Sequence, residues 1–268
     1  DGSAWAQVGN DIDGEASFDT SGRSVSIDSD GSHVAIGANW NDGNGSDSGH
    51  VRIYSWDGSA WSQVGSDIDG EAAGDYSGWS VSIDSDGSHV AIGAYLNDGN
   101  GSGSGHVRIY SWDGSAWTQV GNDIDGEAAS DNSGRSVSID SDRSHVAIGA
   151  NGNDGNGSSS GHVRIYSWDG SAWAQVGNDI DGEAASDYSG YSVSIDSDGS
   201  HVAIGAINND GTASNAGHVR VYQYSGGSWS KLGGDIDGEA GSDRSGFSVS
   251  IDSDGSHVAI GAYTNDGG

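Results

Sequence analysis

The chain has 268 residues and carries 40 Asp and Glu against 9 Lys and Arg, a formal net charge of −31, with 48 Gly and no Cys, Pro or Met. The lack of Cys excludes disulfides, zinc–thiolate sites and thiol catalysis. The acidic excess argues against nucleic acid as a partner and against an anionic membrane surface, since both require basic residues, and no apolar run approaches the roughly 18 residues of a membrane-spanning helix.

The sequence is built from a repeat. The segment Asp-Gly-Ser-Ala-Trp begins at residues 1, 57, 113 and 169, so successive copies start 56 residues apart, and a degenerate fifth copy ends at Trp229. The 10 Trp and 10 Tyr, together with many Val and Ile, form strands readily and argue against the disorder that the glycine content alone would suggest. A period of this length predicts a repeat architecture.

Hydrophobic alternation and turn residues predict four short strands in each repeat. In the first full copy, alternation predicts strand a over residues 24–28, and strand b over 33–38 follows an Asp-Gly turn. Strand c over residues 50–56 follows a loop of Asn, Asp, Gly and Ser, and strand d over 60–64 follows a second Asp-Gly turn. Residues 65–78 are predicted as a loop, and no helical periodicity appears.

This pattern predicts an all-β fold, namely a β-propeller of about five four-stranded blades, with an open β-solenoid as the alternative. We expect a single repeat domain over residues 1–268. Its blade units are predicted at 21–76, 77–132, 133–188 and 189–244, with a fifth blade from 1–20 plus 245–268. The fifth blade lacks strand c, which leaves three explanations open: a fragment of a longer chain, a tolerated gap, or a strand donated by a neighbouring copy.

Strands a, b and d carry a recurring motif. It is Ser-Gly-x-Ser-Val in strand a and Val-Ala-Ile-Gly-Ala in strand b, both within residues 21–38, and Trp-x-Gln-Val-Gly in strand d. This motif resembles the FG-GAP repeat, the blade repeat of integrin α-chain propellers and of many secreted bacterial and algal proteins. The resemblance covers all five units and implies a propeller that serves adhesion, scaffolding or ligand binding. Many members carry a calcium loop between strands a and b, but most of its ligands are missing here and Arg143 replaces its glycine in the third unit.

The acidic loop after strand d is a better candidate for a cation site. Ca²⁺ takes six to eight oxygen ligands, which an Asp-x-Asp-Gly-Glu segment supplies as carboxylates and carbonyls, with an expected dissociation constant of about 0.1–1 mM. The alternative is that these acids are solubilising turn residues held by Asx-turns. The candidate Ca²⁺ ligands are Asp11, Asp13, Glu15, Asp67, Asp69, Glu71, Asp123, Asp125, Glu127, Asp179, Asp181, Glu183, Asp235, Asp237 and Glu239.

The positions that vary between repeats lie at the start of strand a and the end of strand b, and many are aromatic or Arg. These two points meet at one end of an antiparallel pair, so we expect one face around the central opening. Aromatic side chains with Arg suit glycan or protein binding; the alternative is that they fill the channel and pack on each other. The candidate ligand-binding residues are Arg23, Trp40, Tyr76, Trp79, Tyr95, Tyr188, Tyr191, Phe247 and Tyr263.

Two other residue types recur at fixed positions. The nine His occupy only the starts of strands b and c, without a paired-ligand spacing, so we expect them to make structural hydrogen bonds rather than to bind metal. Asn-Gly-Ser, the N-glycosylation acceptor pattern, occurs in three b–c loops, at Asn44, Asn100 and Asn156. These loops are rich in Asn, Gly and Ser, so chance competes with glycosylation as the explanation.

Repeat symmetry shapes the functional prediction. A substrate breaks symmetry, yet almost every Asp, Glu and His recurs in each unit, so we predict that the protein is not an enzyme. We expect an extracellular or cell-surface propeller, a scaffold, adhesive or fibre-assembly subunit that self-associates or binds other extracellular proteins or glycans, with Ca²⁺ as its candidate cofactor. The alternative is a lectin-like propeller that binds glycans on the aromatic face. With neither a signal peptide nor an initiator Met, we expect a mature chain or a fragment.

Overall fold

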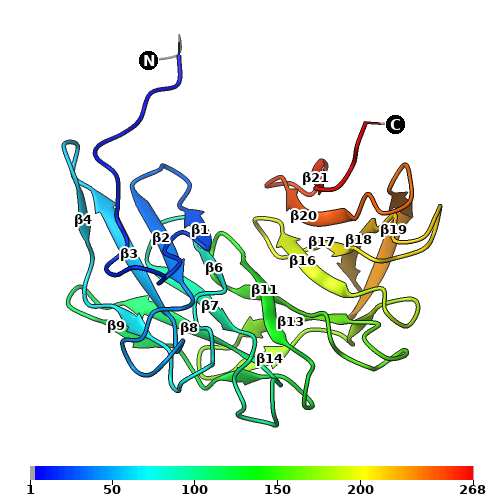
Figure 1. Cartoon of the computed structure of the whole chain (residues 1–268), viewed down its shortest axis with the longest axis horizontal. Coiled ribbons are helices and arrows are strands. Elements are labelled where there is room, and N and C mark those ends of the chain that lie inside the picture. The colour runs from blue at the N-terminus through cyan, green and yellow to red at the C-terminus, as the bar shows by residue number, and fades with distance from the viewer. Residues whose placement is uncertain (1–3, 268) are drawn as a thin grey trace.

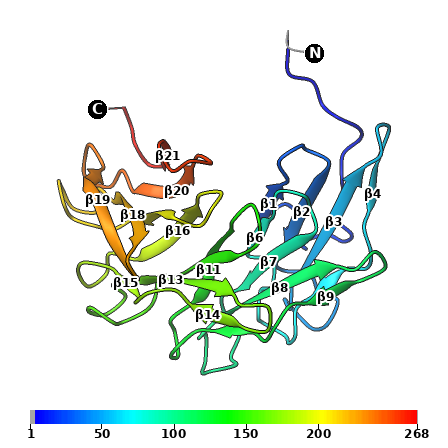
Figure 2. The same cartoon turned by 180° about the vertical axis from the view of Figure 1, so that it is seen from behind.

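β-branched residues and Asp-Gly turns build the same antiparallel sheet in every repeat. The computed structural model describes residues 4–267, and this part of the chain forms strands and turns without a helix, so it holds none that could cross a membrane. Strands a, b, c and d pair in chain order, as in β1-β2-β3-β4. Four sheets have this order, and a fifth holds only β20 and β21. Figures 1 and 2 show the sheets side by side in an arc, with strand a innermost and strand d outermost. The architecture is that of a β-propeller.

The strands have these bounds. Strand a is β1 (Ser24–Ile27), β6 (Ser80–Ile83), β11 (Ser133–Ile139), β16 (Ser189–Ile195) and β20 (Ser245–Ile251). Strand b is β2 (His33–Ala38), β7 (His89–Ala94), β12 (His145–Ala150), β17 (His201–Ala206) and β21 (Val258–Ala262). Strand c is β3 (His50–Trp56), β8 (His106–Trp112), β13 (His162–Trp168) and β18 (His218–Ser225). Strand d is β4 (Trp61–Gln63), β9 (Trp117–Gln119), β14 (Trp173–Gln175) and β19 (Ser228–Asp237). A further short strand is β5 (Ile68–Asp69), β10 (Ile124–Asp125) and β15 (Ile180–Asp181).

The short strand was not predicted. In the first repeat, Ile68 and Asp69 pair with Val51 and His50 of β3, whereas β4 pairs with the other end of β3. Strand d is therefore interrupted, and its two pieces hold different halves of strand c. A two-residue strand is too short to show alternation, which is why residues 65–78 were predicted as a loop.

The predicted fifth blade does not form within the described residues. β20 and β21 pair only with each other, and residues 4–20 contain no strand. Instead, Trp61 donates a hydrogen bond from its indole Nε1 to the Val8 carbonyl at 3.0 Å, so the N-terminal segment contacts the first sheet. The two end sheets are apart in Figure 1, and Ile27 of β1 is 62% exposed where the equivalent Ile83 of β6 is 6% exposed. The arc is thus an unclosed propeller.

The core lies between successive sheets. Val51 and Ile53 of β3 pack against Val81 and Ile83 of β6 in one continuous cluster, and the later interfaces repeat it. Near the axis the sheets approach so closely that a Cβ on Gly37 would lie 2.1 Å from a backbone oxygen of the next sheet. Small residues in strand b thus permit close packing at the inner edge.

Candidate functional site

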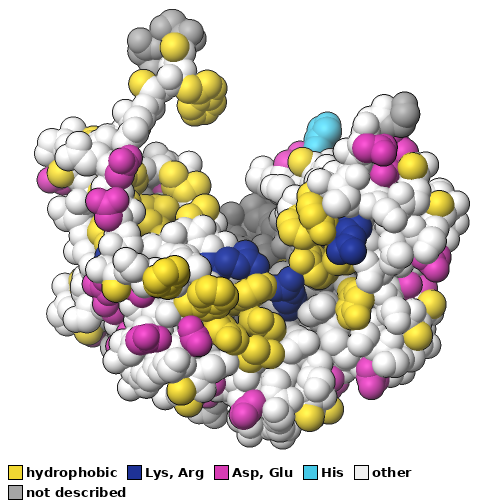
Figure 3. Space-filling model, in the orientation of Figure 1, with side chains coloured by type: hydrophobic (Ala, Val, Ile, Leu, Met, Phe, Trp, Pro, Cys, Tyr) yellow, Lys and Arg dark blue, Asp and Glu magenta, His cyan; other side chains and the backbone are white. Residues whose placement is uncertain are grey.

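The variable positions meet on one concave face. Strand pairs such as Ser80 with Gly93 place the residue before strand a beside the residue after strand b, so the Trp79 and Tyr95 rings lie 4.5 Å apart. Figure 3 shows cationic side chains in dark blue among hydrophobic ones in yellow around this hollow. The face holds a cavity of about 390 Å³, lined by Trp79, Tyr95, Asn132, Arg135, Asn151, Tyr188, Tyr191, Ile207, Asn208 and Arg244.

Arginine and aromatic side chains alternate across this concave face. The Arg135 guanidinium carbon lies 4.5 Å from the Trp79 ring centre and 4.4 Å from that of Tyr191. The Arg23 guanidinium carbon also lies over the Trp79 ring, 3.8 Å from its centre, and Arg244 donates a hydrogen bond to the Tyr263 hydroxyl at 3.2 Å. Desolvation of a cation against aromatic faces is the setting in which cation–π attraction is strongest, and burial lowers the pKa of Arg135.

The cations of the concave face have no acidic partner among residues 4–267, although the chain is rich in acids. The chain has nine Lys and Arg. The other six each form an ion pair with a carboxylate: Arg52, Arg108, Arg143, Arg164, Arg220 and Lys231. The three that form none are Arg23, Arg135 and Arg244, and all three lie on this face. It can therefore offer guanidinium donors to an anion.

The structure places most of the predicted face residues on this surface. The rings of Tyr76 and Tyr95 are stacked with their centres 6.0 Å apart. The Phe247 ring contacts those of Tyr191 and Tyr263, with centre-to-centre distances of 5.3 and 4.2 Å. Trp40, in contrast, is 47% exposed and forms none of these ring contacts. Arg135 and Arg244 were not among the candidate residues predicted from the sequence, although each occupies the same variable repeat position as one of the candidate aromatic residues. That repeat position was the signal that could have found them.

A left-handed backbone conformation orients the variable residue that precedes Ser-Gly in each repeat. Tyr76, Asn132, Tyr188 and Arg244 occupy the same repeat position, and each has a positive φ between 54° and 58°. A bulky residue in this left-handed region costs of order 1 kcal/mol, which the surrounding packing must offset. The conserved geometry across the repeats turns these side chains toward the concave face.

The predicted metal ligands are redistributed between neighbouring repeats. Asp11, Asp13 and Glu15 were expected to share one site, but the structure groups Glu15 with His50 and with Asp67 of the next acidic loop. The same grouping recurs around His106, His162 and His218, with ligand atoms all within 4.8 Å of one another. We call each Glu–His–Asp group an interblade cluster. Its members are Glu15, His50, Asp67; Glu71, His106, Asp123; Glu127, His162, Asp179; and Glu183, His218, Asp235.

The chain path explains this redistribution. The acidic loop runs from one sheet to the next, so its first acid contacts the earlier sheet and its last acid the later one. Gly70 allows this loop to pass close to the preceding b–c loop, because a Cβ there would lie 2.0 Å from the Ser48 carbonyl oxygen. The middle acid contributes through its backbone: the main-chain carbonyl of Asp69 accepts a hydrogen bond from Arg108 Nη2 at 2.8 Å.

The cluster imidazoles are buried and neutral at pH 7. Burial lowers the pKa of His106 to about 4, and the positive charge of Arg108 adds to this effect. His162 behaves alike, with a pKa of about 4 for the same reasons. The expectation of structural hydrogen bonds holds for the other His column, where His145 Nδ1 lies 2.9 Å from Asp140 Oδ2.

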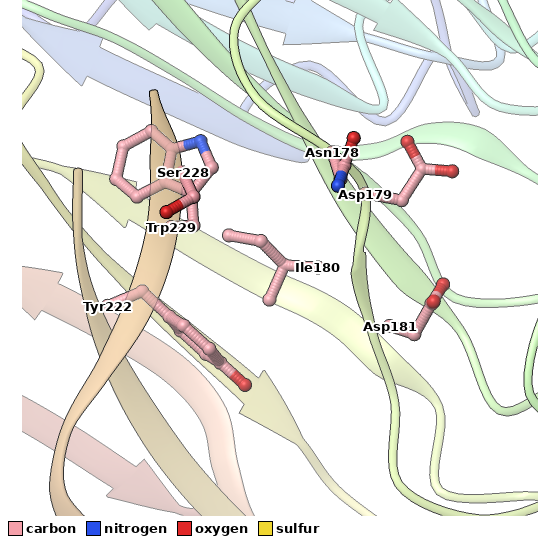
Figure 4. A pocket seen from close by; sticks show the side chains of 7 residues that line it. All are labelled: Asn178, Asp179, Ile180, Asp181, Tyr222, Ser228 and Trp229. Carbon is pink, nitrogen blue, oxygen red and sulfur yellow. The ribbon is translucent and has the colours of Figure 1, made fainter. Parts of the chain in front are cut away.

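Shallow pockets adjoin the interblade clusters. Four of them have volumes between about 220 and 310 Å³, and each is lined by a Tyr, a Trp and the acidic segment. Figure 4 shows one, with Tyr222 and Trp229 on one side of Ile180 and Asp179 and Asp181 on the other. Asp179 thus lines a pocket and also belongs to the cluster of His162.

The predicted glycosylation residues make internal contacts. Asn44 donates from Nδ2 to the carbonyls of Gly70 and Glu71 at 2.9 and 3.1 Å, and Asn100 and Asn156 repeat this arrangement in the next two units. A glycan on Nδ2 would displace at least one of these hydrogen bonds. Glycosylation stays a prediction, and these contacts supply a structural role for the Asn column.

The sequence pattern of the FG-GAP repeat matches residues 11–54, 66–110 and 123–166. No curated protein matches the chain in sequence. Among solved structures, the chain is similar to hydrazine synthase of Kuenenia stuttgartiensis, with a TM-score of 0.58 and 12% identity over 96% of this chain and 58% of that one. It is also similar to the periplasmic gluconolactonase of Pseudomonas aeruginosa, with a TM-score of 0.58 and 13% identity over 88% of this chain and 64% of that one. The chain thus spans about 60% of the length of these two proteins.

These likenesses correct the prediction that the protein is not an enzyme. Both solved structures are propellers named as enzymes, so a propeller built from similar blades does not exclude catalysis. The exclusion rested on the symmetry of Asp, Glu and His, and that reasoning was wrong because it ignored the columns that vary. At this identity the likeness shows the fold alone and assigns no reaction.

Proposed function

We propose that this chain, which belongs to the FG-GAP repeat family, is an extracellular adhesive module that holds an acidic saccharide on its concave face. The observation that carries the proposal is the distribution of cations: Arg23, Arg135 and Arg244 lie among aromatic rings, whereas the other Lys and Arg are paired with acids. A sugar ring can stack on Trp or Tyr, and a carboxylate accepts charge-assisted hydrogen bonds from guanidinium.

The charge of the chain limits the size of this ligand. A net charge of −31 repels anions over roughly a Debye length, which is about 8 Å at physiological salt. A long polyanion would extend from the hollow over acidic loops and meet that repulsion. A single acidic unit, such as a uronic acid at a chain end, reaches the arginines and avoids it. The cavity of about 390 Å³ suits one or two sugar rings.

The sequence favoured a scaffold or fibre subunit over a glycan-binding module, and the concave face supports the reverse order. An adhesive role follows from the same face, because a protein that binds sugars can attach to a glycan-bearing surface. The extracellular setting belongs to this proposal. Self-association stays a separate expectation that light scattering can examine on the same samples.

The test is calorimetric titration with methyl glucuronide, with methyl glucoside as the neutral counterpart. We expect binding of the acid only, and a loss of about tenfold or more in affinity for Arg135→Gln and for Arg23→Gln, since a hydrogen bond to a charged group contributes about 1.5–3 kcal/mol. Arg23 is exposed, so its replacement leaves the fold intact. The matched control is Arg143→Gln, which removes a charge paired with Asp86 at 3.0 Å. Equal binding of both sugars, or an equal effect of all three variants, would refute the proposal.

A further inference from the structure

We propose that the interblade clusters are binding sites for a first-row transition-metal dication such as Zn²⁺. Each offers one imidazole nitrogen and two carboxylate oxygens from three separate chain segments, which only the stacking of adjacent repeats brings together. The sites use side chains other than those of the concave face, so this proposal and the saccharide proposal can fail separately.

A buried nitrogen without a partner points to a ligand. His106 is 1% exposed, and none of the residues 4–267 accepts or donates a hydrogen bond at its Nδ1. Nδ1 is directed into the cluster, 3.8 Å from Glu71 Oε2 and 3.8 Å from Asp123 Oδ2. Both separations are too long for a hydrogen bond, and leaving a buried polar atom unsatisfied costs about 1–3 kcal/mol. A cation between the three atoms would satisfy all of them.

The spacing and chemistry favour zinc over calcium. Ligand atoms about 2.0–2.2 Å from a tetrahedral zinc lie about 3.3–3.6 Å apart, and the two separations from His106 Nδ1, each 3.8 Å, exceed this by a few tenths of an ångström. The Glu71 side chain is 44% exposed and can rotate to close the difference. Imidazole suits Zn²⁺ and its neighbours in the series, whereas Ca²⁺ prefers oxygen ligands alone. The calcium prediction for these acids omitted the His.

Other side chains hold each carboxylate in place. Gln119 donates from Nε2 to Asp123 Oδ1 at 2.6 Å, which leaves Oδ2 for the cluster. Arg108 Nη1 lies 3.6 Å from Glu71 Oε1, which leaves Oε2 for the cluster. Each carboxylate therefore keeps one oxygen directed at the imidazole. Partners of this kind orient metal ligands and commonly contribute 10–100-fold in affinity, an effect of about 1.4–2.7 kcal/mol.

The fourth cluster shares the buried, unpartnered Nδ1, at His218, but differs in the cations around its carboxylates and so provides an internal contrast. Lys231 replaces the Gln of the other copies and lies 2.6 Å from Asp235 Oδ1, while Arg220 contacts both Asp235 and Glu183. Two cations thus neutralise the carboxylates around His218. A metal ion would have to displace them, so we expect the clusters of His50, His106 and His162 to bind and that of His218 not to bind.

The experiment measures bound metal by equilibrium dialysis of the purified chain against ZnCl2 in a millimolar excess of CaCl2. We expect three Zn²⁺ ions from these clusters. His106→Phe, which fills the space of the imidazole but offers no nitrogen ligand, should lower the bound metal by one ion. The matched variant His218→Phe should leave it unchanged. Lys231→Gln should raise it by one ion, and a folding defect cannot imitate that gain.

The outcomes separate the alternatives. Loss of one ion in His106→Phe together with a gain of one in Lys231→Gln supports the proposal. No difference between His106→Phe and the parent protein would overturn it, and so would an equal loss in His218→Phe. Displacement of the metal by the calcium excess would overturn the assignment to a transition metal.

Discussion

The unclosed arc can be tested with two substitutions that are identical in local sequence. Ile27 and Ile83 occupy the same position of strand a, in the segment Ser-Val-Ser-Ile, but are 62% and 6% exposed. Ile83→Ala removes a side chain buried against Ile53 and Ile92, which costs about 2–5 kcal/mol of unfolding free energy. Ile27 is only partly buried, so Ile27→Ala should cost about 1 kcal/mol. The loss of strand propensity is common to both and cancels in the comparison.

The assay is urea unfolding followed by tryptophan fluorescence and by circular dichroism, since coincident transitions are needed before free energies of a repeat protein are compared. We expect the Ile83→Ala loss to exceed the Ile27→Ala loss by about 2 kcal/mol. Equal losses of about 2 kcal/mol or more would show that Ile27 is covered in solution. The interpretation of the first sheet as an open end would then be wrong.

Two further predictions concern the sheet contacts and the hairpins. Gly93→Ala should destabilise the protein by about 1–3 kcal/mol or more, because the new Cβ would lie 2.2 Å from the Gly134 carbonyl oxygen, whereas Gly234→Ala has nothing within 4 Å and should change the urea midpoint little. The hydrogen bond to Asp140 raises the pKa of His145, so its stabilising effect is complete below the ordinary His pKa of about 6.5 and is lost as the pH rises through the folded-state value. The melting temperature should fall as the pH rises through this range, and His145→Gln should reduce this pH dependence. An unchanged pH dependence in the variant would mean that other groups cause it.

The strands were predictable because each is set by local chemistry. β2 and β3 begin and end where alternation and the Asp-Gly turns place them, at His33–Ala38 and His50–Trp56. The short strand β5 and the state of the fifth blade were not, because both depend on contacts between repeats. Ile68 becomes a strand residue only by pairing with Val51, and the N-terminal segment lies on the first sheet through the indole of Trp61 rather than beside β21.

The concave face and the interblade clusters differ in the same way in how far the sequence predicts them. The concave face followed from strand pairing within a repeat, which puts Trp79 beside Tyr95. The interblade clusters could not be seen within one repeat, because Glu71 and Asp123 reach His106 from loops on either side of it. An acidic segment that looks like one calcium loop in the sequence is a connection between two sheets, and its acids are shared between them.

Repetition and variation in this chain therefore have different consequences. A repeat position that is the same in every copy generates one cluster per repeat, and a single departure such as Lys231 alters one cluster by pairing with Asp235. A column that varies generates one asymmetric surface, because Arg135, Trp79 and Tyr191 come from successive repeats and meet once. A ligand with one preferred pose requires that second kind of surface. The search for specificity in a nearly symmetric propeller should begin at the positions where its repeats disagree.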